Sequence, residues 1–139
     1  MCVRGASVLD DLLAEFPDAD IRVQVVWEPV LRSDIAAPLT RVLGLLHDRR
    51  VTQYWDPGRV ILADLVRSVN EDPARYQHDE KLPPGFVAWD VVAVFAKPSR
   101  WERDLPAPVY YGGPVVNSID AARTAIADEL AAGTDPGQR

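Results

Sequence analysis

The spacing of hydrophobic residues changes within the first thirty positions of the chain. In the first segment apolar residues recur every three or four positions, which predicts an amphipathic helix. The apolar face of this helix consists of Ala6, Leu9, Leu12, Leu13 and Phe16. From position 21 the period becomes two, because apolar residues alternate with Arg22 and Gln24 before an apolar run that ends at Trp27. This pattern predicts a strand that enters a covered part of a sheet and stops near Pro29.

Two further helices are predicted on either side of a short extended segment. Pro38 suits the first position of a helix. The apolar stripe that follows consists of Leu39, Val42, Leu43 and Leu46. Residues 51–55 form either a short strand or an extended link. Asp56 and Pro57 signal the start of the next helix, because a carboxylate can cap the first amides and proline already has a helical φ. The stripe of this helix continues to about Asn70.

The second half of the chain contains two β-rich segments. "FVAWDVVAVFA" (86–96) is rich in β-branched and aromatic residues and is the strongest strand candidate. "VYYGGPVVN" (109–117) predicts a second strand, which Gly-Gly-Pro interrupts with a bulge or an edge position. The connection over residues 97–108 is long for a hairpin, so it is a candidate functional loop.

A helix closes the chain, and the whole pattern predicts one domain over residues 1–133. Asn117 or Ser118 is the predicted cap of this helix, Gly133 its end, and residues 134–139 a disordered tail. The first strand can run parallel to a later one through a helical crossover, and the last two strands most simply form an antiparallel hairpin. The predicted fold class is therefore α/β, a sandwich with helices on both faces of a central mixed sheet.

Composition and charge narrow the range of partners. The chain has 139 residues and a formal net charge of −6, and it contains no run of basic residues. An acidic chain of this kind is not expected to bind nucleic acid. A membrane is not expected as a partner either, since no apolar run approaches the roughly 20 residues of a membrane span. Arg4, Asp10 and Asp11 also interrupt any signal-peptide core. With a single cysteine no internal disulfide can form, and the cytoplasm is the expected location.

The order of elements resembles the thioredoxin-like fold over residues 2–132, with a helical insertion and loop at 57–85. "VWEPVL" after "DADIRV" is similar to the second strand of uncharacterised bacterial thioredoxin-like proteins. "CVRGA", followed by the first helix, is similar to the second half of the family's C-x-x-C motif. The resemblance implies that the family's first strand and first cysteine are missing here. Either the protein begins as written, or its true start lies upstream; we favour the second interpretation.

Cys2 is the candidate catalytic residue. The amides and dipole at a helix N-terminus stabilise a thiolate, and Arg4 is close enough in sequence to contribute. A lone thiolate can form mixed disulfides with glutathione or a protein partner without a second cysteine. The alternative interpretation is a frayed terminal thiol without a function.

Two further positions are candidate substrate-binding residues. The family keeps a cis-proline opposite its cysteine, just before the hairpin, and Pro84, with Pro83 beside it, is the nearest match; a two-proline turn explains the pair equally well. Trp101 lies in the long loop beside Arg100 and Arg103, where it can cover a cleft or bind a partner. The other three tryptophans are expected to fill the core.

The remaining ionisable residues have structural interpretations that we prefer. Glu28, Asp56 and Asp90 could form a catalytic trio, but a rim position, a helix cap and an outward-facing strand position explain them better. His47 and His78 lack the convergent ligands that a metal site needs. We therefore expect no metal and no cofactor.

The sequence thus supports several functions. The first is a thiol-disulfide redox protein, weakly active or inactive as written, with a protein or a small thiol as its redox partner. The second is a non-catalytic binding module that holds a protein partner or a small ligand with the Trp101 loop. The third is a homodimer, in which a second copy supplies the missing strand and covers an exposed edge.

Overall fold

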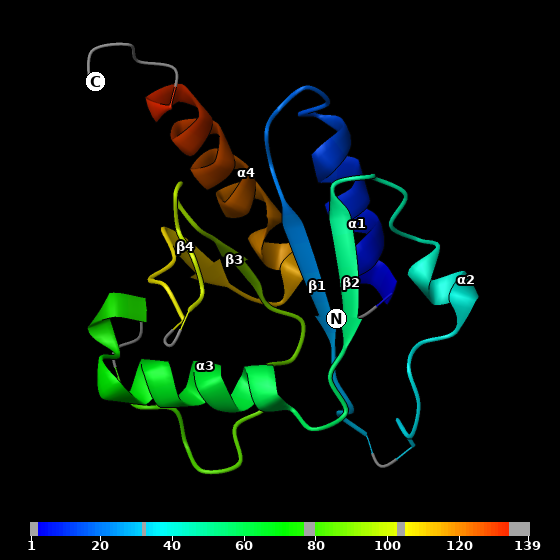
Figure 1. Ribbon diagram of the computed structural model, residues 1–139, viewed down its shortest axis with the longest axis vertical. Coiled ribbons are helices and arrows are strands. Elements are labelled where there is room, and N and C mark those ends of the chain that lie inside the picture. The colour runs from blue at the N-terminus through cyan, green and yellow to red at the C-terminus, as the bar shows by residue number, and fades with distance from the viewer. Residues whose placement is uncertain (1–2, 32, 77–79, 103–104, 134–139) are drawn as a thin grey trace.

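The computed structural model describes residues 3–31, 33–76, 80–102 and 105–133 (Figure 1). The helices are α1 (Val3–Ala14), α2 (Thr40–Leu43), α3 (Val60–Glu71) and α4 (Val115–Ala132), with a 3-10 turn, η1, at Ala74–Tyr76. The strands are β1 (Val23–Trp27), β2 (Val51–Trp55), β3 (Val92–Val94) and β4 (Tyr110–Gly112). The fold is mixed α/β, and its elements follow the predicted order. No helix in these ranges is long and apolar enough to cross a membrane.

The strands form two separate pairs in the described part of the chain, and not the single mixed sheet that was predicted. β1 pairs with β2 in parallel, with Val23 opposite Val51 and Trp27 opposite Trp55. β3 pairs with β4 in antiparallel fashion. The parallel pair and the hairpin were both predicted, but β1 and β3 do not share hydrogen bonds in a common sheet. Figure 1 shows the two pairs beside one another and α3 across the lower end of the view. α1 packs against α4.

Three predicted boundaries were wrong. The strand predicted at 86–96 covers only Val92–Val94, because Asp90 has φ 58°, a left-handed conformation that an extended strand excludes. The predicted helix at 38–46 is the single turn α2, which ends where the Gly44 N–H bonds back to Thr40. The last helix begins at Val115 after Pro114, and not at the predicted cap Asn117 or Ser118.

Two hydrophobic clusters hold these elements together. The first joins α1, β1 and α4, and its most buried side chains include Leu12, Leu13 and Val115. The second lies between α3, η1 and the loops that flank the hairpin, and it includes Val69, Tyr76, Leu82 and Leu105. Residues 57–85 contain α3 and η1, which contribute most of the second cluster.

Candidate binding groove

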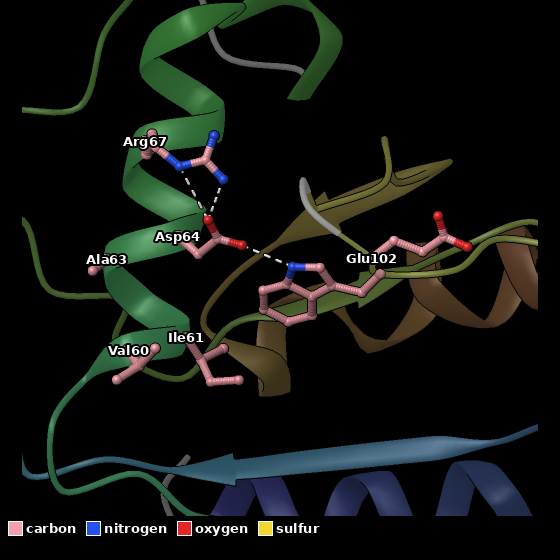
Figure 2. Close-up of a pocket in the computed structure, with 7 residues that line it drawn as sticks. Val60, Ile61, Ala63, Asp64, Arg67 and Glu102 are labelled. Atoms are coloured by element: carbon pink, nitrogen blue, oxygen red, sulfur yellow. Dashed lines mark hydrogen bonds and ion pairs between the residues drawn. The ribbon is translucent and has the colours of Figure 1, made fainter.

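A groove runs between α3 and the loop segment at 101–102 (Figure 2). It is lined by Val60, Ile61, Ala63, Asp64, Arg67, Trp101 and Glu102. Its volume of about 490 Å³ lies in the range of small-molecule and side-chain binding sites. Apolar side chains form much of this lining, and Val60 is 69% exposed at its edge. The groove therefore offers apolar surface that no other part of the described chain covers.

Trp101 is held in the groove by a hydrogen bond to α3. Its indole Nε1 donates to Asp64 Oδ2 over 2.7 Å, as Figure 2 shows. Arg67 holds the same carboxylate from the next turn, with Nε 3.1 Å from Asp64 Oδ1. The Trp101 residue nevertheless remains 39% exposed. A ring with only two side-chain torsions, already fixed by a hydrogen bond, loses little entropy when a ligand packs against it.

The position of α3 is fixed by two carboxylates at the carboxyl edge of the parallel strands. Because Trp27 and Trp55 lie in register, the residues that follow them, Glu28 and Asp56, come together at this edge. Asp56 Oδ2 accepts a hydrogen bond from the Ile61 N–H over 2.7 Å, and Glu28 Oε1 accepts from the Leu62 N–H over 3.1 Å. Both groups satisfy amides at the start of α3. Asp56 thus binds an amide in the first turn of α3, as expected of a capping carboxylate, but the helix begins at Val60 after Arg59 and not at the predicted Pro57.

The electrostatics of this edge are unfavourable for Glu28. Desolvation raises the pKa of Glu28 above its usual value, and the neighbouring Asp56 charge raises it further. The bond from the Leu62 amide acts in the opposite direction but does not outweigh burial. The hydrogen bond of Glu28 therefore stabilises the start of the helix, while the desolvation of its charged carboxylate is unfavourable.

Asp90 does not share the contacts that Glu28 and Asp56 make at the start of α3. It is 4% exposed, whereas the sequence predicted an outward-facing position. Its carbonyl accepts a hydrogen bond from Val115 N–H at the start of α4. Its carboxylate lies against α1, where a Cβ added to Gly5 would be 2.6 Å from Asp90 Oδ1. Asp90 thus packs between the beginnings of two helices.

The other predicted site residues have different outcomes. Cys2 is outside the described residues, and α1 begins with the next residue, Val3. Pro84 is exposed in a turn and does not line the groove. The cis peptide bonds precede Pro98 and Pro114, so the prediction of a cis-proline at Pro83 or Pro84 was wrong.

The predictions for the histidines and the remaining tryptophans were partly correct. His47 is exposed beside Asp10, with Nδ1 3.2 Å from Oδ2, and His78 is outside the described residues. No group of three or more metal-ligating side chains occurs in the described chain. Trp27 is 6% exposed, as expected for a core residue, but Trp89 is 53% exposed, so its predicted place in the core was wrong.

The sequence identified Trp101 but not its partners on α3. Asp64, Arg67 and Glu71 have the i, i+3 and i+4 spacing that predicts ion pairs on an exposed helix face. That spacing does not reveal a bond to a tryptophan 37 positions away from Asp64. No family model, no curated protein and no solved structure matches this chain.

Proposed function

We propose that this protein is a binding module that holds an apolar group of a protein partner or small ligand in the groove between α3 and Trp101. One observation carries the proposal: Trp101 is fixed by Asp64 yet remains substantially exposed over apolar side chains of α3. An exposed aromatic ring that is already oriented is the type of residue that dominates binding energy in protein interfaces. No reacting group is required for this function.

A neutral fluorescent probe, Nile red, tests the proposal directly. We expect the probe to bind the native protein with a blue-shifted emission, and Trp101→Ala to weaken this binding by at least about tenfold. Trp89→Ala is the matched control, because Trp89 is also exposed but does not line the groove. Val60→Thr, which changes an exposed side chain at the groove edge, should weaken binding without affecting the fold. Absence of binding, or equal loss in both tryptophan variants, would refute the proposal.

A second candidate function is thiol-disulfide exchange by a thioredoxin-like sandwich with Cys2 as the reactive residue. It is favoured by the helix pair α1 and α4 beside a parallel strand pair and a hairpin. In the described residues β1 and β3 each have one edge without a strand partner. A central strand that paired with both edges would produce the single mixed sheet of that fold.

The rate of Cys2 alkylation by iodoacetamide as a function of pH tests this second candidate. A thiolate stabilised by the amides of α1 should titrate below the value of about 8.5 that is ordinary for cysteine. The same protein unfolded in urea provides the reference, because it retains the thiol and loses the helix. Identical titration curves in the folded and unfolded protein would exclude a reactive thiol.

A further inference from the structure

The charges around the groove are not balanced. Arg67 is the only basic side chain that lines the groove among the described residues, and it bonds to Asp64 and Glu71. Its positive charge is therefore shared between two carboxylates. Glu102 also lines the groove, and no hydrogen bond or ion pair within the described chain involves its carboxylate. Arg100 precedes Trp101 in the sequence but does not line the groove.

The same surface combines apolar area with an aromatic face. Val60, Ile61 and Ala63 provide the apolar floor and edge along α3. Trp101 presents part of its indole beside them, and Figure 2 shows Glu102 on the same loop segment, with its carboxylate extending away from this ring. An indole face attracts a cation within about 6 Å, and tryptophan is the most effective of the aromatic residues. An arginine or lysine over this ring would lie in a groove whose lining also includes Glu102, which has no ion pair in the described chain.

From this charge complementarity we propose that the groove binds a peptide segment in which an apolar side chain is followed closely by an arginine or lysine. This proposal rests on the proposed binding function and names its ligand class. The apolar side chain packs on Val60 and Ile61, and the cation lies over Trp101 at the side of the groove that Glu102 lines. The net charge of −6 on the whole chain favours approach of a cationic peptide and disfavours an acidic one.

Three peptides that differ only in charge test the proposal. These are Ac-Leu-Arg-Leu-Arg-NH2, Ac-Leu-Gln-Leu-Gln-NH2 and Ac-Leu-Glu-Leu-Glu-NH2. Binding is measured by titration while the indole N–H resonance of Trp101 is followed by NMR. We expect the arginine peptide to bind about fivefold or more tightly than the glutamine peptide, and the glutamate peptide most weakly. The preference should decrease as the salt concentration rises from low to about 0.5 M.

Variants separate charge recognition from apolar binding. Glu102→Gln should reduce the preference for the arginine peptide about threefold and leave binding of the glutamine peptide unchanged. Asp128→Asn is the control, because this exposed carboxylate lies on α4 and not in the groove. Equal binding of all three peptides, or no effect of Glu102→Gln, would overturn the proposal. Nile red binding that depends on Trp101 would then still support the proposed function, whereas loss of both signals would reject both.

Discussion

The two hydrophobic clusters of this protein are assembled in different ways. The first cluster joins α1, β1 and α4, and the parallel pairing of β1 with β2 extends over five residues in each strand. The second is built from one face of α3 and from residues in loops, and its associated strands are only three residues long. The first core therefore relies on regular elements, whereas the second relies on individual side chains that connect loops. The candidate groove belongs to α3, which is part of the second core.

In each core a polar side chain connects segments that regular structure does not join. In the first, the Arg50 guanidinium donates to the carbonyls of Leu13, Phe16 and Ala19, and so joins the end of α1 to β2. In the second, the buried Tyr76 hydroxyl donates to the Leu105 carbonyl, and so joins η1 to the loop before β4. We expect the first connection to stabilise the fold more, because it is charged and satisfies several carbonyls at once.

Arg50→Ala should have the largest effect on stability. The substitution leaves three carbonyls at the end of α1 without their donor and Asp48 without its partner, so we expect a loss of about 3 kcal/mol in the free energy of unfolding. Urea denaturation measures this loss. Arg49→Ala is the matched control, since that exposed side chain makes none of these bonds, and it should change stability by less than about 0.5 kcal/mol. Equal effects of the two substitutions would show that the connection does not stabilise the first core.

The same connection predicts sensitivity to acid. Hydrogen bonds from the Arg50 side chain and backbone lower the pKa of Asp48 to about 2. A carboxyl whose pKa is lower in the folded than in the unfolded protein stabilises the fold above its unfolded pKa, and this stabilisation is lost as the pH falls. The native protein should therefore lose stability between about pH 4 and pH 2. In Arg50→Ala this part of the acid dependence should be reduced.

Tyr76→Phe should have an intermediate effect and act on the second core. It removes one buried hydrogen bond and retains the ring, so we expect a loss of about 1–2 kcal/mol. Tyr54→Phe is the control, because Tyr54 is 47% exposed. Hydrogen exchange then tests whether the two cores open separately: amides of α3 should exchange faster in Tyr76→Phe while amides of β1 do not. Equal acceleration in both elements would mean that the cores unfold as one unit.

The contrast between the cores also explains what the sequence could predict. The order of elements follows from hydrophobic spacing, and the first core was predicted well because α1 and β1 have clear periods of 3.6 and two residues. The bond from the start of α3 to Asp56 was predicted for a similar local reason, since it spans only five positions, although the helix begins three residues later than predicted.

Features that depend on distant contacts could not be predicted. The length of β3 depends on the left-handed conformation of Asp90, which is coupled to the start of α4 by the bond from Val115. Trp89 lies in an apolar segment and Trp101 lies among charged residues. Trp89 is nevertheless exposed, whereas Trp101 is oriented by Asp64. Hydrophobic periodicity carries no information about such side-chain pairs between separate elements. The sequence therefore predicted a candidate functional loop with Trp101 as a binding residue, but not the groove that Trp101 forms with α3.

Glu28→Gln should have the smallest effect on stability, and at neutral pH it should raise stability where the other substitutions lower it. Glu28 links the first core to α3, because it follows β1 and accepts a bond from the Leu62 amide. Burial raises its pKa, so the folded protein binds its proton more tightly than the unfolded protein does. The free energy of unfolding therefore falls as the pH rises from the pKa of Glu28 in the unfolded protein to its higher pKa in the folded protein. Above the folded-state pKa this loss of stability is complete. Glutamine keeps an oxygen that can accept the Leu62 bond and carries no charge.

We therefore expect Glu28→Gln to be slightly more stable than the native protein at pH 7 and to lose this advantage near pH 4. The measurement is urea denaturation of both proteins over this pH range. Glu15→Gln is not a suitable control because Glu15 pairs with Arg123, whereas Asp128→Asn changes an exposed carboxylate with no such contact in the described chain. A less stable Glu28→Gln at pH 7 would show that the charge on Glu28 strengthens the start of α3 more than burial weakens it. In that case the junction between the two cores would depend on an ionised carboxylate, and α3 with its groove would be destabilised by acid.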